Sequence, residues 1–156
     1  MSADGALALC ETQTLVFREA AEAHTSLTPA LLGECPFDPA GWQAHRVIAP
    51  GTPLLLRYSA LTFNAHRIHY DLAYAQEVER YRGLVVHGPL VASLLLQLAA
   101  AGYGENALRA FSFRGLSPAI AGEPLHLVMR EADGELELGA FADGGRQVTQ
   151  ASAQLA

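Results

Sequence analysis

The chain has 156 residues, 51% of them hydrophobic, and a net charge of −6 at pH 7, so it can form one domain with a sizeable core. Charged residues make up only 17%, which argues against disorder, and no cluster of Lys and Arg indicates a nucleic-acid partner. Cys10 and Cys35 stand in no CxxC pattern and indicate neither a zinc site nor a disulfide framework. With no signal peptide visible after Met1, a reducing, cytoplasmic location is expected.

The first third of the chain is expected to contain short strands and a linker. Leu15–Phe17 is a short apolar run typical of a strand, and residues 25–39, which include three prolines, are typical of a linker. Trp42–Ile48 and Thr52–Tyr58 are then predicted to form two strands, the second with a continuous apolar centre.

The middle of the chain is predicted to be helical. Asp71 can N-cap a helix that runs to about Val78. The most apolar stretch, Leu84–Ala101, approaches membrane length, but polar residues and a proline interrupt it. We therefore predict a helix in a protein core, stopped by Gly102 and Gly104, and no membrane span. Because this helix is apolar nearly all round, other elements must wrap it.

The last third has the pattern of an antiparallel meander. Its four predicted strands are Leu108–Phe113, Leu125–Met129, Leu136–Phe141 and Gln147–Leu155. Asp133-Gly134 and Asp143-Gly144 are hairpin turn signals between the last three. The predicted fold class is α+β, with an antiparallel sheet wrapped around one long apolar helix, which is the hot-dog arrangement.

Two short stretches carry the residues suited to chemistry. Asn64, His66, Arg67, His69 and Asp71 fall within eight residues between a predicted strand and a helix, where catalytic groups are commonly found. The second stretch places His87-Gly88 at the start of the apolar helix. Backbone N–H groups there are unpaired and lie at the positive end of the helix dipole, so they can stabilise an oxyanion.

These stretches resemble the two motifs of the MaoC-like, or hydratase-2, family. Thr62–His69 (Thr-Phe-Asn-Ala-His-Arg-Ile-His) resembles its motif Ser-Gly-Asp-x-Asn-Pro-(Leu/Ile)-His, and Gly83–Leu90 resembles the His-Gly motif that begins its long helix. The closer resemblance is to the branch that includes 3-hydroxyacyl-thioester dehydratases and mesaconyl- or methylfumaryl-CoA hydratases. It covers about Trp42 to the C-terminus, and Glu11–Glu19 resembles the tail of a preceding hot-dog half that many relatives carry.

The resemblance implies reversible, R-specific hydration of a 2-enoyl thioester of CoA or an acyl carrier, without a metal or redox cofactor. His69 is expected to be the general base, because an imidazole with a pKa of about 6.5 suits proton transfer near neutrality. Asn64 stands where the wider family has its base Asp, and is expected to orient water, since an amide cannot take a proton. The Gly88 N–H is expected to hold the thioester oxygen. The residues expected to contact substrate are His66, Arg67 and His87.

Each of these residues also has a simpler interpretation. Asn64 can form an Asx turn, and Asp71 can be only a helix cap. His66 can face the site or the solvent, Arg67 can be a solvated charge, and His87 can be structural. His66 and His69 form an HxxH pattern, but no carboxylate or Cys completes a metal set, so no metal site is predicted.

The resemblance also bears on domains and assembly. Residues 1–40 are interpreted as an N-terminal strand and linker, a remnant of a preceding hot-dog half, and residues 41–156 as the MaoC-like domain. A single hot-dog unit leaves an edge strand and a face bare, so a homodimer, a higher multiple of two, or a separately encoded hot-dog partner is expected. The alternatives to a hydratase are a non-catalytic thioester-binding or structural subunit and a hot-dog thioesterase.

Overall fold

The computed structural model describes residues 5, 7–16, 19–22, 24–31 and 36–156. All the helices and strands in this described part follow Gln43. In chain order they are β1 (Ala44–Ile48), α1 (Thr52–Thr62), the 3-10 helix η1 (Arg67–His69), α2 (Leu72–Glu77), α3 (Gly88–Tyr103), β2 (Leu108–Gly115), β3 (Leu125–Ala132), β4 (Glu135–Ala142), the 3-10 turn η2 (Asp143–Gly145) and β5 (Gln147–Leu155).

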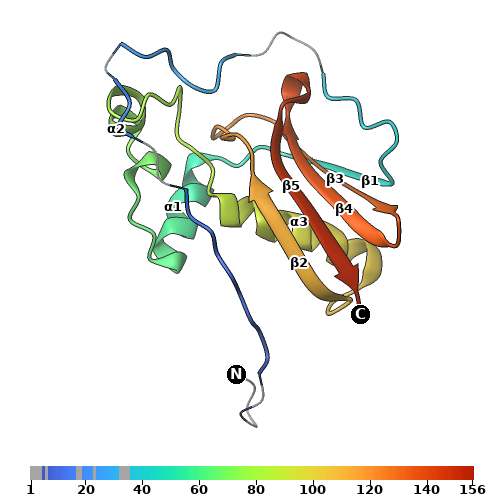
Figure 1. The fold of residues 1–156 in the computed structure, drawn as a ribbon. Coiled ribbons are helices and arrows are strands. Elements are labelled where there is room, and N and C mark those ends of the chain that lie inside the picture. The colour runs from blue at the N-terminus through green and yellow to red at the C-terminus, as the bar shows by residue number, and fades with distance from the viewer. Residues whose placement is uncertain (1–4, 6, 17–18, 23, 32–35) are drawn as a thin grey trace.

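The five strands form one antiparallel sheet in the order β1-β3-β4-β5-β2, with α3 packed across one face of it (Figure 1). The hairpin between β3 and β4 turns at Asp133 and Gly134, both with positive φ (51° and 82°), as the Asp-Gly signal predicted. Gly144, with φ of 80°, lies in the turn between β4 and β5. The four strands predicted in the last third are therefore confirmed, with β5 matching at both ends.

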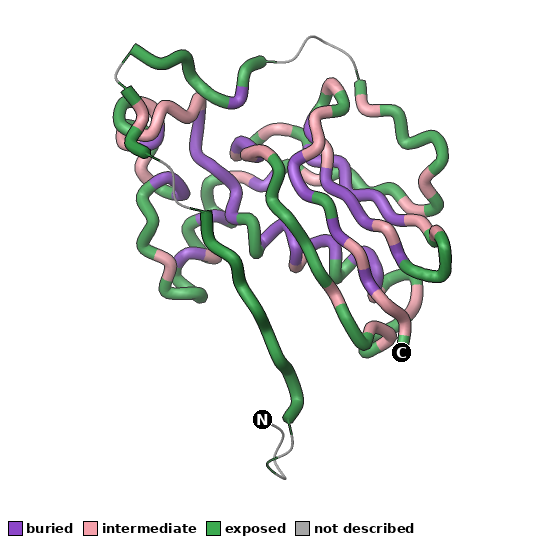
Figure 2. Tube along the Cα trace, in the orientation of Figure 1, coloured by how far each residue is buried: buried purple, intermediate pink, exposed green. Residues whose placement is uncertain are grey.

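The core lies between α3 and the sheet. Alternate residues of β3, such as Leu125, Leu127 and Met129, are buried in the same cluster as Leu95 and Leu98 of α3. Figure 2 shows this as buried stretches along the central strands and the helix, while β2 at the sheet edge is mostly exposed. Helices α1 and α2 lie to one side of the sheet and α3, beyond the start of α3 (Figure 1).

The predicted strand Thr52–Tyr58 is wrong, because this segment is the first part of helix α1. Pro53 sits in the first helical turn, where its missing N–H costs nothing. Only Leu55 and Ser59 of α1 are buried, four residues apart on one face. A short apolar run such as Leu54–Leu56 has no period of its own, so helix and strand cannot be told apart from it.

Two other boundaries differ from the prediction. Leu15 and Val16 are exposed and lie in no strand, and Phe17, the rest of that predicted strand, is outside the described residues. Leu84–Val86 is extended rather than helical, and Val85 forms an isolated bridge with Ile120. Helix α3 begins only at Gly88, so Pro89 lies in its first turn, where the missing N–H of a proline costs no helical hydrogen bond.

Candidate active site

The two motif stretches meet through backbone hydrogen bonds beside the start of α3. The Val85 N–H donates to the Ile68 carbonyl at 3.0 Å, and the Val86 N–H donates to the Ala119 carbonyl at 2.9 Å. The extended segment before α3 is thereby fixed between η1 and the loop after β2. His69, from the first stretch, and His87, from the second, are brought together although they are far apart in the sequence.

His69 is buried, with 6% of its surface exposed. Its Nδ1 lies 2.7 Å from the Val85 carbonyl oxygen. A carbonyl can only accept, so Nδ1 carries a proton, and in the neutral ring Nε2 is left with a free lone pair. Burial lowers the pKa of His69 below its ordinary value, the Val85 hydrogen bond opposes this, and the nearby His66 adds to the lowering. At neutral pH the ring is therefore a free base with its accepting nitrogen defined.

His87, the N-cap residue of α3, lies flat against His69. The ring centroids are 3.6 Å apart with an interplanar angle of 19°. His87 is only 1% exposed, and its Nε2 is 2.8 Å from the hydroxyl oxygen of Ser59 in α1. Burial, and then the neighbouring His69, lower the pKa of His87 to about 4. The His87 ring is consequently neutral near pH 7.

Asn64 and His66 form a turn beside the His69 and His87 rings. The Asn64 Oδ1 accepts from the His66 N–H at 2.9 Å, which is the Asx turn named above as the simpler interpretation. His66 itself is exposed, and the edge of its ring faces the His69 ring at a centroid distance of 5.6 Å. His66 therefore lies both at the surface and against the proposed base. The role of Asn64 in orienting water stays a prediction.

Arg67 already has a partner in the fold. Its Nε and Nη2 donate to Asp71 Oδ2 at 3.1 and 2.7 Å, and its guanidinium lies over the Tyr74 ring, 4.2 Å from the centroid. The other carboxylate oxygen of Asp71 accepts from the Tyr74 N–H at 3.0 Å and so caps α2, as predicted. The hydrogen bond from the Tyr74 N–H, and then that from Arg67, lower the pKa of Asp71, and the hydrogen bond to Asp71 raises the pKa of Arg67. A substrate contact for Arg67 remains a prediction.

Gly88 is the first residue of α3 and is exposed. The first N–H groups of an α-helix have no intrahelical acceptor and lie at the positive end of the dipole. Apart from its chain neighbours and the backbone of its own helix, no described atom lies within 4 Å of a Cβ built at Gly88, so the space beside its Cα is open. The position suits an oxyanion donor next to the two stacked histidines.

Ser59 and Tyr58 belong to this site but were not predicted. Ser59 is buried and binds His87, and the Tyr58 ring tilts against His87 at a centroid distance of 4.9 Å. Both precede the motif stretch Thr62–His69 by a few residues. The predicted strand ended at Tyr58, so Ser59 was assigned to no element, whereas in the structure it is a buried residue of α1.

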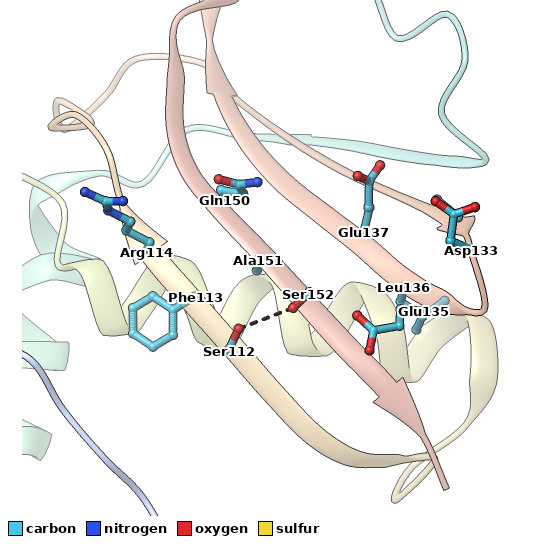
Figure 3. Close-up of a pocket in the computed structure, with 11 residues that line it drawn as sticks. Ser112, Phe113, Arg114, Asp133, Glu135, Leu136, Glu137, Gln150, Ala151 and Ser152 are labelled. Carbon is cyan, nitrogen blue, oxygen red and sulfur yellow. Dashed lines mark hydrogen bonds between the residues drawn. The ribbon is translucent and has the colours of Figure 1, made fainter.

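A shallow hollow lies elsewhere, on the face of the sheet turned away from α3. Figure 3 shows polar side chains of β2, β4 and β5 around it, among them Ser112, Glu137 and Gln150. None of the predicted site residues lines it. An open, acidic surface over strands offers no defined base or oxyanion donor, so the candidate site stays at the histidine cluster.

In the described part of the chain, no three or more His, Cys, Asp or Glu side chains are grouped so that they can bind a metal ion. Within the same residues, no helix has the length and apolarity needed to cross a bilayer.

Comparison with known proteins identifies relatives for both sequence and fold. The family model of hydroxyacyl-thioester dehydratase type 2 matches residues 1–121. Mesaconyl-C(4)-CoA hydratase of Chloroflexus aurantiacus is 41% identical over 149 residues, which is 96% of this chain and 51% of that protein. The mitochondrial hydroxyacyl-thioester dehydratase type 2 of Schizosaccharomyces pombe is 39% identical over 90 residues, covering 56% of this chain and 30% of that protein.

Among solved structures, an (R)-hydratase from A. caviae involved in PHA biosynthesis has a TM-score of 0.62 and 24% identity, covering 70% of this chain and 89% of that one. At this identity the match shows the fold alone, and it confirms the predicted hot-dog arrangement. The chain spans about half the length, or less, of the two curated relatives. The match to the family model includes residues 1–40, which the motif resemblance left out. The chain is therefore a hot-dog protein that belongs to the hydroxyacyl-thioester dehydratase type 2 family.

Proposed function

We propose that this protein is a hydro-lyase that hydrates 2-enoyl thioesters and dehydrates 3-hydroxyacyl thioesters. The observation that carries the proposal is the state of His69. It is a buried imidazole, its Nδ1–H is committed to the Val85 carbonyl, and its Nε2 lone pair is left for proton transfer close to the start of α3. The names of the two curated relatives describe the same reaction in its two directions.

In the proposed mechanism His69 Nε2 takes a proton from water while the water oxygen bonds to C3 of the enoyl group. The π electrons of the C2=C3 bond move toward the thioester carbonyl, whose oxygen gains negative charge. The Gly88 N–H donates to that oxygen, a contribution typically worth about 2.7–4 kcal/mol for one such donor. The proton then passes to C2, and dehydration follows the same steps in reverse.

The substrate is proposed to be a CoA or acyl-carrier thioester, with mesaconyl-type dicarboxylic acyl groups as first candidates because of the relative from Chloroflexus. The test is a hydration assay of the purified protein with crotonyl-CoA and mesaconyl-CoA, followed by the loss of enoyl thioester absorbance. Free thiol is measured in parallel. Thiol release would identify a thioesterase, and failure of the folded protein to convert either thioester would favour a non-catalytic subunit.

We also propose that a second hot-dog unit covers the site. Leu61 and Phe63, at the end of α1 beside the motif stretch, are 80% and 94% exposed, which is costly for apolar side chains in water. A second copy of this chain is the simplest cover, since a two-fold dimer needs one self-complementary surface. Light scattering at micromolar concentration should give an even multiple of the chain mass, and a monomer with full activity would contradict this. The separately encoded partner and the cytoplasmic location also stay predictions.

A further inference from the structure

The mechanism above uses no atom of the His87 ring, although this ring is the most completely buried imidazole near the site. Its Nδ1 is buried and has no hydrogen-bond partner among the described residues. Its Nε2 has one partner, Ser59 Oγ at 2.8 Å. A buried polar atom without a partner destabilises a fold, so its presence in a packed site calls for a reason.

The single partner determines which nitrogen carries the proton. A serine hydroxyl can donate or accept, so it accommodates either tautomer at Nε2. If the proton were on Nδ1, a buried N–H donor would have no acceptor, and such orphaned N–H groups are rare in native proteins. With the proton on Nε2, His87 donates to Ser59 and leaves only a lone pair unpaired. A second proton on Nδ1 would again lack an acceptor, so the ring stays neutral.

A neutral ring in this place serves His69 in two ways. Packed flat at 3.6 Å, it covers one face of His69 and fixes the tilt of that ring, while the Val85 carbonyl fixes its rotation. It also adds no positive charge beside a base that becomes an imidazolium when it takes a proton, and a charge at that distance would oppose the transfer strongly.

We propose that Ser59 and His87 are positioning residues, in which Ser59 holds an uncharged His87 ring against His69 so that the base keeps its orientation and its free Nε2. The inference rests on the proposed function, because it assigns His69 as the base. It adds a part for α1, whose Ser59 is 28 residues away from His87 in sequence.

The predicted tautomer and neutral charge of His87 are tested by nitrogen-15 and carbon-13 NMR of the histidine-labelled full chain without substrate. In the wild-type protein His87 should show the Nε2–H tautomer and stay neutral at pH 6, while His69 shows the Nδ1–H tautomer. A His87 that carries its proton on Nδ1, or that titrates together with His69, would overturn the proposal. This measurement needs no variant and no turnover.

The positioning role of Ser59 is tested with the Ser59→Ala variant. Ser59→Thr is the conservative variant, and Ser112→Ala is the control. Ser112 is an exposed serine of β2 whose hydroxyl contacts Ser152 at 3.2 Å. Without the Ser59 hydroxyl, His87 loses its hydrogen bond and should pack less closely against the His69 ring, which becomes more exposed to water. The pKa of His69 should then rise toward its ordinary value of about 6.5. In step with it, kcat for crotonyl-CoA should fall about tenfold with little change in KM, as for loss of one buried hydrogen bond.

The acid limb of the kcat profile should move to higher pH with the His69 pKa, and Ser59→Thr should restore both values. An unchanged His69 titration and unchanged kcat in folded Ser59→Ala would overturn the inference while leaving the hydratase proposal intact. A wild-type chain that converts no thioester, yet shows the expected tautomers, would contradict the proposed function instead.

Discussion

Replacing His69 by Ala removes the proposed base, and the structure indicates what else is lost. The ring gives one hydrogen bond to the Val85 carbonyl and one stacked contact with His87. The bond from the Val85 N–H to the Ile68 carbonyl, which joins the two motif stretches, involves no side chain and remains. We expect a stability loss of about 1–3 kcal/mol, within the range that most folded domains tolerate. The variant should therefore fold, and its activity can be measured.

The catalytic effect should be much larger than the structural one. Loss of a general base typically lowers kcat by about 10²–10⁴-fold, so kcat of His69→Ala on crotonyl-CoA should fall at least ~10²-fold, or about 2.7 kcal/mol in barrier height. The acid limb of the wild-type pH profile, which lies below the ordinary histidine pKa because burial lowers that of His69, should disappear. His24→Ala, which changes an exposed histidine, is the control. A folded His69→Ala whose kcat stays within about threefold of wild type would refute the assignment.

Three other outcomes are expected. Asn64→Asp should retain activity on crotonyl-CoA, because a carboxylate oxygen can still accept from the His66 backbone N–H. Its activity on a dicarboxylic acyl-CoA should fall if the new charge repels the substrate carboxylate. Equal loss of activity on both substrates would contradict this expectation. The free energy of unfolding should fall as the pH drops from about 6.5 to about 4, because the unfolded chain takes up a proton at His87 that the folded chain refuses, and denaturant titrations of His87→Phe should show a shallower fall. Glu123→Gln should cost about 1–2 kcal/mol in thermal unfolding, since it weakens the partly buried pair with Arg82, whereas Glu135→Gln, an exposed control, should cost little.

The sheet and the long helix were predictable because their signals are local. Alternating residues and the Asp-Gly turns define β3, β4 and β5, and the continuous apolar pattern with Gly104 after its end defines α3. Gly102, the other predicted stop, lies inside the helix. Helix α1 was not predictable in the same way. Its run of three leucines fits the period of a helix and that of a strand equally well. Several leucines of α1 are also exposed, so its sequence has no clear division into an apolar and a polar face.

The site was predictable as a set of residues but not as an arrangement. The family motifs singled out His69, His87 and Gly88, while the stacking of the two rings depends on how the segment before α3 pairs with η1 and the loop after β2. The partner of Arg67 was within reach of sequence reasoning, because Asp71 follows it by four residues. The hydroxyl of Ser59 was not, since it becomes a neighbour of His87 only through the tertiary fold.

The arrangement also bears on the proposed reaction with Asn64 where the wider family has a carboxylate. A carboxylate next to His69 would stabilise the imidazolium and raise its pKa, whereas here burial and the exposed His66 lower it. A base with a lowered pKa is fully deprotonated at neutral pH but accepts a proton less readily. The transition state must then draw more on donors to the thioester oxygen, such as the Gly88 N–H, which act more strongly when water is excluded. Gly88 and Phe63 are both exposed in the single chain, so the covering unit proposed above would exclude water from the Gly88 N–H and strengthen its hydrogen bond to the thioester oxygen.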